Sequence, residues 1–166
     1  MCTVSQYNVL NLVYKVIRME TDLIEYSIER MSVVCIENFL KKVDYLFIPK
    51  LSQTLDILKY AEKLSENAIC FIASDNDQPV AFLAAYFNDK SFKTGYITMF
   101  ATIESYQHKG IGTKLIENTI AYASEFKFQH IVLESELHQV PFYQKRGFEI
   151  IEKKPKSYMM KYQLKI

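Results

Sequence analysis

The chain reads Gln107-His108-Lys109-Gly110-Ile111-Gly112-Thr113 between a predicted strand over residues 95–102 and a predicted helix over 113–126. The first backbone N–H groups of a helix have no partners within the helix, and the helix dipole adds partial positive charge there. The two glycines let the backbone approach an anion closely and permit a positive φ. The stretch therefore predicts a loop that binds phosphate.

Two other phosphate-binding motifs fit this stretch less well. A P-loop requires Gly-Lys-Ser/Thr, but Gly112 is followed by Thr113 and only then by Lys114, which excludes it. A dinucleotide-binding fingerprint requires a third glycine where Leu115 stands, directly after a strand. Because a polar loop separates the strand from the glycines, a dinucleotide-binding oxidoreductase remains only a weak alternative.

The hydrophobic periodicity on both sides of this loop predicts a mixed α/β chain built on a largely antiparallel sheet. The predicted order is β-α-α-β-β-β-α-β-α-β-β, with Thr21-Asp22 as an additional helix start in the N-terminal third. Strands are predicted over 14–18, 69–74, 79–88, 95–102, 131–133, 148–153 and 158–164, and helices over about 29–42, 54–65, 113–126 and 139–146.

Composition restricts the class of protein. The 166 residues suit one domain with a substantial core, and the hydrophobic fraction of 49% is ordinary for a globular chain. Twenty basic against nineteen acidic residues leave a net charge of +1, which gives no reason to expect nucleic acid or a membrane as partner. Three scattered cysteines and three histidines predict no metal site. The start of the chain lacks a signal-peptide pattern, so we expect a cytoplasmic protein.

Two stretches together resemble the signatures of the GNAT N-acetyltransferase superfamily. The first is Gln-x-x-Gly-x-Gly at the helix start, preceded by Ala101-Thr102-Ile103-Glu104-Ser105-Tyr106. The second is Val140-Pro141-Phe142-Tyr143-Gln144-Lys145-Arg146-Gly147-Phe148, at the spacing typical of the family. The resemblance covers residues 68–164. It implies one domain over 1–166, with a coenzyme-binding core over about 68–164, acceptor-side helices over about 21–66, a splayed parallel strand pair and about four flanking helices.

The resemblance also implies roles for individual residues. Tyr143 would be the general acid, because a phenol of pKa about 10 is well matched to a thiol leaving group. Glu134 would be either a general base or a surface carboxylate paired with a lysine, and Tyr45 and Phe47 would either contact the acceptor or pack in the core. The residues implied to hold the coenzyme are Phe100, Ala101, Thr102, Gln107, His108, Lys109, Gly110, Ile111, Gly112 and Thr113.

The function implied by the resemblance is transfer of an acetyl group from acetyl-CoA to a primary amine, by direct attack in a ternary complex. A small-molecule amine, an amino sugar and a peptide N-terminus all remain open as acceptors. A GNAT-like domain that binds acyl-CoA without catalysis is the main alternative, although such a domain would not need Tyr143. A homodimer would suit the family, but no sequence feature requires one.

Overall fold

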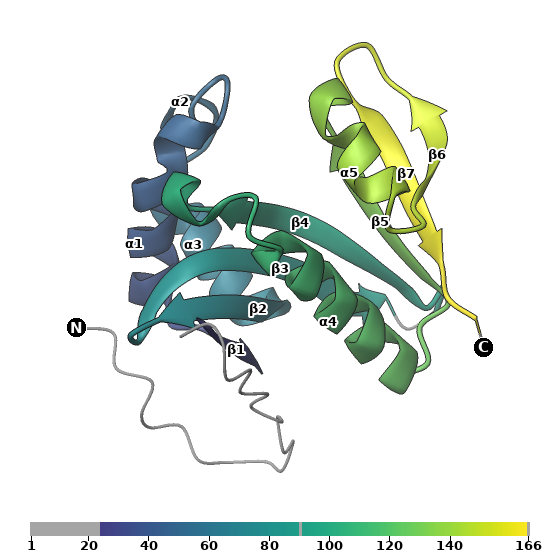
Figure 1. The fold of residues 1–166 in the computed structure, drawn as a ribbon, viewed down its shortest axis with the longest axis horizontal. Coiled ribbons are helices and arrows are strands. Elements are labelled where there is room, and N and C mark those ends of the chain that lie inside the picture. The colour runs from purple at the N-terminus through teal and green to yellow at the C-terminus, as the bar shows by residue number, and fades with distance from the viewer. Residues whose placement is uncertain (1–23, 90, 166) are drawn as a thin grey trace.

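The computed structural model describes residues 24–89 and 91–165, which form one seven-stranded sheet with helices on both faces (Figure 1). All neighbouring strands are antiparallel except β4 and β5, which are parallel. In spatial order the strands are β1 (Ile24–Glu29), β2 (Ala68–Asp75), β3 (Gln78–Asp89), β4 (Thr94–Thr102), β5 (His130–Ser135), β7 (Tyr158–Gln163) and β6 (Glu149–Lys153). The predicted mixed fold with one parallel pair is confirmed.

The helices divide the hydrophobic residues into two cores, one on each face of the sheet. One core lies between the sheet and α1 and α3, and includes Phe39, Leu64 and Phe82. The other lies between the sheet and α4 and α5, and includes Leu115 and Phe148. The α-helices are α1 (Val33–Val43), α2 (Leu51–Thr54), α3 (Ile57–Asn67), α4 (Ile111–Glu125) and α5 (Val140–Gln144), and short 3₁₀ turns η1, η2 and η3 span Asp44–Leu46, Glu104–Tyr106 and Leu137–Gln139.

The N-terminal part of the chain is where the sequence predictions were least accurate. The strand predicted over 14–18 and the helix start at Thr21-Asp22 lie outside the described residues. The helix predicted from Glu29 begins only at Val33, because Ser32 caps it by accepting the Cys35 N–H, and Glu29 instead pairs with β2 as the last residue of β1.

Other boundaries shift by a few residues for similar local reasons. The helix predicted over 54–65 is divided, because Asp56 caps α3 by accepting the N–H of Lys59 at 3.1 Å while Thr54 ends α2. The helix predicted from Thr113 begins two residues earlier, at Ile111. The helix predicted over 139–146 is shorter, with the 3₁₀ turn η3 before α5.

Candidate active site

The two parallel strands pair for only part of their length, and this creates the site. Residues 94–97 of β4 pair with residues 130–133 of β5. Beyond that point, no described strand pairs with residues 98–102 of β4 on this side, whereas Glu134 and Ser135 of β5 still pair with β7. The two strands diverge from there in a V (Figure 1). The splayed pair expected from the sequence is therefore present, and Phe100, Ala101 and Thr102 lie on the unpaired edge of β4.

A bulge marks the start of the splay. Across β3 and β4, Ala85 pairs with Ile97 and Ala84 pairs with Met99, which leaves Thr98 as the extra residue. A bulge bends its strand and increases the local twist. Residues 98–102 are thereby turned away from the line of β5, and their backbone is left available for an added extended chain.

The phosphate loop predicted from the sequence leads directly into α4. Gly110 and His108 both have positive φ, 80° and 60°, and α4 follows over 15 residues without a side-chain cap at Gly110. A Cβ built on Gly110 would meet no atom within 4 Å, so the space in front of the helix start is open. The Gln107 amide donates to the Thr102 carbonyl at 3.0 Å, which ties the loop to the end of β4. An anion would therefore meet uncapped N–H groups beside the splay.

Aromatic rings line the path from this loop to the splay. A Cβ on Gly112 would lie 3.1 Å from the Phe100 ring and 3.5 Å from the Phe142 ring, and the two ring centroids are 6.0 Å apart. The Arg146 guanidinium carbon lies 3.6 Å from the centre of the Phe142 ring, and the guanidinium donates to the Thr113 hydroxyl. Arg146 therefore links the end of α5 to the first turn of α4. Glycine at 112 is thus required by close packing, and the two phenyl rings form an apolar wall suited to a chain of methylene groups.

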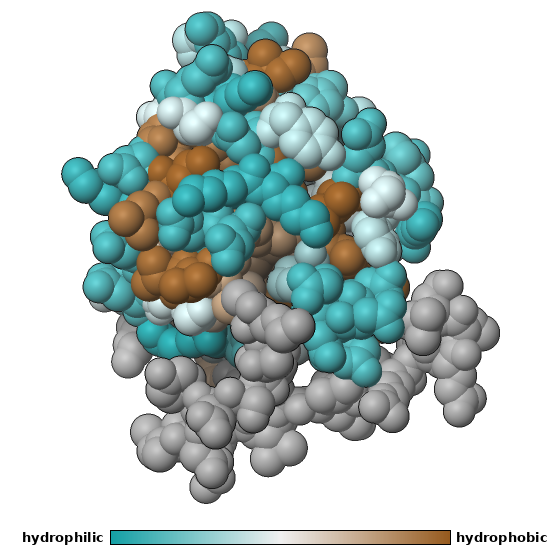
Figure 2. Space-filling view, turned by 90° about the vertical axis from the view of Figure 1, so that its left-hand side faces the viewer, coloured by the Kyte–Doolittle hydropathy of each residue, from teal (hydrophilic) through white to brown (hydrophobic). Residues whose placement is uncertain are grey.

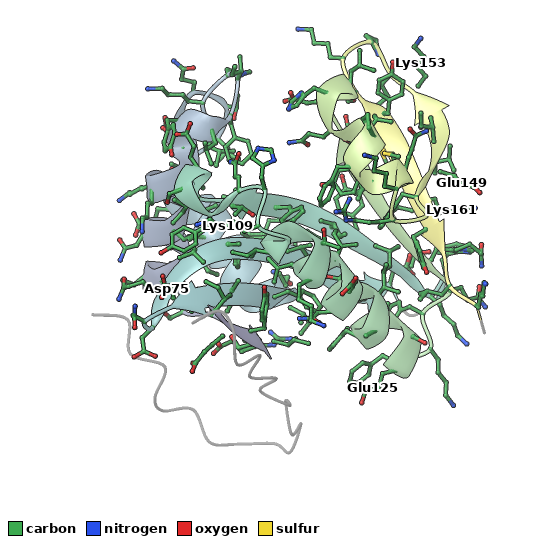
Figure 3. All side chains as sticks on the ribbon, viewed as in Figure 1. Asp75, Lys109, Glu125, Glu149, Lys153 and Lys161 are labelled. Atoms are coloured by element: carbon green, nitrogen blue, oxygen red, sulfur yellow. The ribbon has the colours of Figure 1, made fainter. Side chains whose placement is uncertain are left out.

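The Lys109 ammonium lies 5.1 Å from the centre of the Tyr106 ring, on the rim of the loop (Figure 3). The Tyr106 hydroxyl in turn donates to the Asp75 carboxylate at 2.6 Å, which raises the pKa of Tyr106. These contacts hold the 3₁₀ turn η2 against the end of β2. The positive charge of Lys109 is therefore placed close to the predicted phosphate position.

Tyr143 lies on α5 with only 6% of its surface exposed. The rings of Phe142 and Phe148 pack edge-on against it, with centroids at 5.1 and 5.7 Å. Burial raises the pKa of the Tyr143 phenol well above its ordinary value, so the hydroxyl keeps its proton throughout the physiological range. None of the hydrogen bonds within the described residues involves this hydroxyl, and its proton is free to be donated to a bound group.

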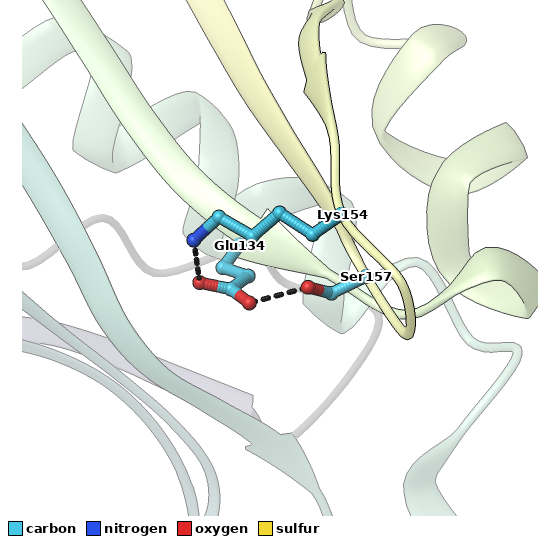
Figure 4. Close-up of polar contacts among 3 residues, drawn as sticks. All are labelled: Glu134, Lys154 and Ser157. Carbon is cyan, nitrogen blue, oxygen red and sulfur yellow. Dashed lines mark hydrogen bonds and ion pairs between the residues drawn. The ribbon is translucent and has the colours of Figure 1, made fainter.

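Glu134 is the first residue of β5 beyond the last pair with β4, at the base of the V. Its carboxylate accepts hydrogen bonds from the Lys154 ammonium at 2.8 Å and from the Ser157 hydroxyl, both in the loop between β6 and β7 (Figure 4). These two bonds lower the pKa of Glu134. The predicted pairing of Glu134 with a lysine is thus present, and its role as a general base stays a prediction.

The opposite side of the V carries the residues expected to meet the acceptor. Tyr45 is 52% exposed in the turn after α1, whereas Phe47 is partly buried and packs on the core beneath α1 and α3. The connector is fixed by Asp44, whose carboxylate accepts the N–H and the hydroxyl of Ser52, each at 2.8 Å. The connector leads into α2, which stands across the opening of the V from α5 (Figure 1). On the side formed by α1 and its neighbours, hydrophobic areas alternate with hydrophilic ones (Figure 2).

A group of tyrosines beside the bulge had no signal in the sequence. The Tyr60 hydroxyl on α3 donates to the Thr98 carbonyl at 3.1 Å and lies 3.0 Å from the Thr98 hydroxyl. Tyr86 and Tyr96 form a cross-strand pair next to it. Burial raises the pKa of Tyr60 to about 12. Nothing in the spacing of these residues along the chain shows that they converge, because the contacts span three separate elements.

Comparison with known proteins identifies the family. The model of the acetyltransferase (GNAT) family matches residues 37–148. The chain belongs to the GNAT family of acetyltransferases. Among solved structures, Ard1 from Thermoplasma volcanium aligns with a TM-score of 0.69 at 20% identity, over 85% of this chain and 99% of that one. The PaiA N-acetyltransferase from Thermoplasma acidophilum, in complex with coenzyme A, aligns with a TM-score of 0.68 at 14% identity, over 83% and 98%. At these identities the likeness shows the fold.

Curated relatives match part of this GNAT chain. N-alpha-acetyltransferase 30 from Xenopus laevis is 32% identical over 85 residues, which cover 48% of this chain and 31% of that protein. The human protein of the same name is 31% identical over 85 residues, 48% of this chain and 24% of that protein. The chain thus spans less than a third of the length of these relatives.

Residues 24–89 and 91–165 contain neither a metal-binding cluster nor a helix that could cross a membrane. In these two ranges, no three His, Cys, Asp or Glu side chains gather closely enough to hold a metal ion. No helix in that part of the GNAT chain is long and apolar enough to cross a membrane.

Proposed function

We propose that this chain transfers an acetyl group from acetyl-CoA to a primary amine, by direct attack of the amine while both substrates are bound. The observation that carries the proposal is the splay of β4 from β5 directly beside the uncapped start of α4. One end of this site offers N–H groups to a pyrophosphate, and the other offers an unpaired strand edge to an amide-containing arm. Acetyl-CoA has both groups at the two ends of one molecule.

In this proposal the backbone N–H groups of residues 108–113 bind the pyrophosphate. The pantetheine arm lies along residues 100–102 and pairs with them like an added strand, against the apolar wall formed by the Phe100 and Phe142 rings. A backbone N–H of the unpaired β4 edge then polarises the thioester carbonyl and stabilises the oxyanion that develops on attack.

Tyr143 is proposed to complete the transfer. The neutral amine nitrogen forms a bond with the thioester carbon and gives up one proton to solvent, the C–S bond breaks, and the departing sulfur takes the phenolic proton of Tyr143, which the phenolate regains from solvent. Burial raises the pKa of Tyr143, which keeps the proton on the phenol before the reaction. Because an ordinary thiol has a pKa of about 8.5, proton transfer to the sulfur requires that the bound coenzyme bring the Tyr143 pKa back toward its ordinary value of about 10. A domain that only bound acyl-CoA would have no use for this proton.

For the acceptor we propose a peptide N-terminus in preference to an alkyl amine. The amine must attack unprotonated, and an α-amino group of pKa about 7.7–8.0 is roughly one-tenth unprotonated at pH 7, against less than about a thousandth for an alkyl amine of pKa about 10.4. The lowered pKa of Glu134 makes it a weak base, which favours the less basic amine. The curated relatives, named for α-amine acetylation, support the same choice. Tyr45 and Phe47 would provide the apolar wall for the first residues of the peptide.

Thermal unfolding with acetyl-CoA, with NADH and ATP in parallel, tests the cosubstrate. A ligand at about a hundred times its dissociation constant adds roughly 2.7 kcal/mol to the free energy of unfolding, or on the order of 5–10 °C for a domain of this size. A shift with acetyl-CoA alone is expected. A shift with NADH and none with acetyl-CoA would overturn the proposal.

Release of CoA thiol in the presence of different amines tests the reaction. The panel consists of short peptides with free N-termini, the same peptides blocked at the N-terminus, spermidine and glucosamine. We expect turnover with free peptides and none with blocked ones. Turnover of spermidine or glucosamine with no turnover of free peptides would contradict the proposed acceptor while leaving the acetyl transfer intact.

A further inference from the structure

A primary amine of the chain itself lies at the base of the V. The Lys154 ammonium is 2.8 Å from the Glu134 carboxylate, and Glu134 directly follows the last residue of β5 that pairs with β4. In Figure 4 the Lys154 side chain extends from the β6–β7 loop to the carboxylate on β5. The nitrogen is thus held beside the point where the strand edge of β4 becomes free.

The strand register places Glu134, and with it the Lys154 ammonium, beside β4, because Tyr96 pairs with Val132, which lies two residues before Glu134 on the same face of β5. Tyr96, two residues before the bulge at Thr98, interacts with the charges of both Glu134 and Lys154. The side chains of Lys154 and Glu134 are 35% and 39% exposed, so neither is locked in the core. The Ser157 hydroxyl and the backbone of the hairpin turn, where the Lys154 N–H donates to the Ser157 carbonyl at 2.9 Å, hold the arrangement.

We propose that Lys154 is a slow internal acetyl acceptor, so that the site acetylates the Lys154 side-chain nitrogen when acetyl-CoA is bound and no other amine is present. An alkyl amine is rarely unprotonated at pH 7, but this nitrogen is held permanently beside the site, which offsets its small neutral fraction. The inference rests on the proposed acetyl transfer at the same site. Lys154 would then be a modification site. It would also compete with the external acceptor, because its ammonium occupies the Glu134 carboxylate that the ammonium of an incoming acceptor would otherwise contact.

The reaction follows the same balance as transfer to an external amine. The Lys154 ammonium first loses a proton, through Glu134 to solvent. Its neutral nitrogen then bonds to the thioester carbon and gives up a second proton to solvent, the C–S bond breaks, and the sulfur leaves as CoA thiol with the proton of Tyr143, which the phenolate regains from solvent. The products are an N-acetylated lysine and CoA.

The modified lysine would change the site in a defined way. An acetylated nitrogen carries no charge, so the ion pair with Glu134 is lost and the carboxylate keeps only the Ser157 hydroxyl among the partners seen here. Acetylation of Lys154 therefore releases Glu134 for the external acceptor.

The pH dependence of the step follows from the charged groups around the nitrogen. Glu134 on β5 and Glu152 on β6 face it, with Tyr96 on β4 on the third side, and the hydrogen bond to Glu134 is the main cause that raises the pKa of Lys154. Because the attacking form is the neutral amine, the rate of self-acetylation rises with pH, about tenfold per unit below the lysine pKa.

Site-resolved mass spectrometry of the intact chain after incubation with acetyl-CoA at pH 8 tests the inference. Lys153 serves as an internal control, because it is exposed at the outer end of the hairpin, with its ammonium 5.9 Å from the centre of the Tyr158 ring (Figure 3). We expect acetylation of Lys154 at least about ten times faster than acetylation of Lys153 or Lys156, with a rate constant that does not change on tenfold dilution of the protein.

Two variants separate an enzymatic from a spontaneous modification. Tyr143→Phe is expected to slow acetylation of Lys154 at least about tenfold and leave that of Lys153 unchanged, and Lys154→Arg is expected to remove the fast site. Equal labelling of the three lysines, or labelling of Lys154 that Tyr143→Phe does not slow, would overturn the inference. If free peptides are turned over while Lys154 stays unmodified, this inference fails and the proposed function stands; if acetyl-CoA gives neither a thermal shift nor turnover, the proposed function itself fails.

Discussion

The groups proposed to bind acetyl-CoA and to protonate its sulfur form the coenzyme face of the site and lie in short contiguous stretches: residues 100–102 on the edge of β4, residues 107–113 at the start of α4, and Phe142 and Tyr143 on α5. On the acceptor face, the polar groups at the splay come from separate elements. Tyr60 bonds to Thr98 across 38 positions of the chain, and Lys154 to Glu134 across 20. The first face is built from local backbone geometry, and the second from side chains that meet only through tertiary structure.

This difference separates what each face can do. Backbone N–H groups and glycines provide a site for one invariant cosubstrate, because their geometry does not depend on distant side chains. The other face consists of phenols, a carboxylate and an ammonium, whose charges and hydrogen bonds depend on one another. Substitutions on the second face should therefore change the preferred acceptor without changing the binding of acetyl-CoA on the first face.

The largest effect is expected from Tyr143, the side chain proposed as the general acid. Tyr143→Phe should lower kcat by about 10²- to 10⁴-fold, because the leaving sulfur loses its proton donor. The thermal shift with acetyl-CoA should persist, because the aromatic ring and its packing remain. The control is Tyr162→Phe, whose ring packs against Phe148 from β7 at 5.4 Å. If both variants keep wild-type kcat, the coenzyme face holds no general acid.

A second prediction concerns the glycine that the two phenyl rings enclose. Gly112→Val should weaken acetyl-CoA binding by roughly 5- to 100-fold, because overpacking of about 1–3 kcal/mol displaces Phe100 or Phe142. Isothermal titration calorimetry measures the change. Gly147→Ala is the matched control. An added Cβ there would lie 3.1 Å from the Tyr162 ring, as close as the Gly112 Cβ would lie to Phe100, and the φ of 84° would strain an alanine. Equal loss of affinity in both variants would show that general instability is the cause.

On the acceptor face, Tyr60, the half-buried tyrosine next to the bulge, should affect stability. Tyr60→Phe removes the bond to Thr98 and should lower the free energy of unfolding by about 0.5–1.5 kcal/mol, measured by urea denaturation. The exposed Tyr45→Phe should change it by less than about 0.5 kcal/mol. Because the folded pKa of Tyr60 is raised to about 12, its contribution is complete below the unfolded pKa of about 10 and is lost as pH rises through 12. Equal loss in both variants would contradict the role of this bond.

The smallest effect is expected from the ion pair itself. Lys154→Met should lower Tm by no more than about 2 °C at pH 7, because both side chains are partly exposed and solvent screens the pair. The pKa of Glu134 is lowered in the fold, so its contribution is present above about pH 4.3 and is lost as pH falls through the folded pKa. The pKa of Lys154 is raised, so its contribution is present below about pH 10.4 and is lost as pH rises further.

Thermal scans of Lys154→Met and of Lys153→Met across this pH range check the prediction. The difference between Lys154→Met and the unmodified chain should vanish in strong acid and in strong alkali, while Lys153→Met should stay close to the unmodified chain throughout. A difference for Lys154→Met that stays constant with pH would indicate lost packing in place of a lost charge interaction.

The fold could be predicted wherever a pattern is local. The strands of the meander, α4 and the terminal hairpin were placed within a few residues, because alternation and helical spacing are properties of neighbouring positions. The start of α1 was predicted four residues too early, although Ser32 is a local N-cap and residues 24–28 alternate apolar and polar as a strand does. Thr54 and Asp56 both suit a helix start, and in the structure it is Asp56 that caps α3.

The glycine-containing start of α4 and the place of Tyr143 on α5 could be predicted from the sequence, because each rests on a short contiguous pattern. The departure of β4 from β5 after residue 97, and the ion pair between Glu134 and Lys154, depend on how distant segments are arranged in the folded sheet. Strand pairing and ion pairs depend on the register and distance between segments that lie far apart in the sequence. Those quantities exist only once the sheet has formed.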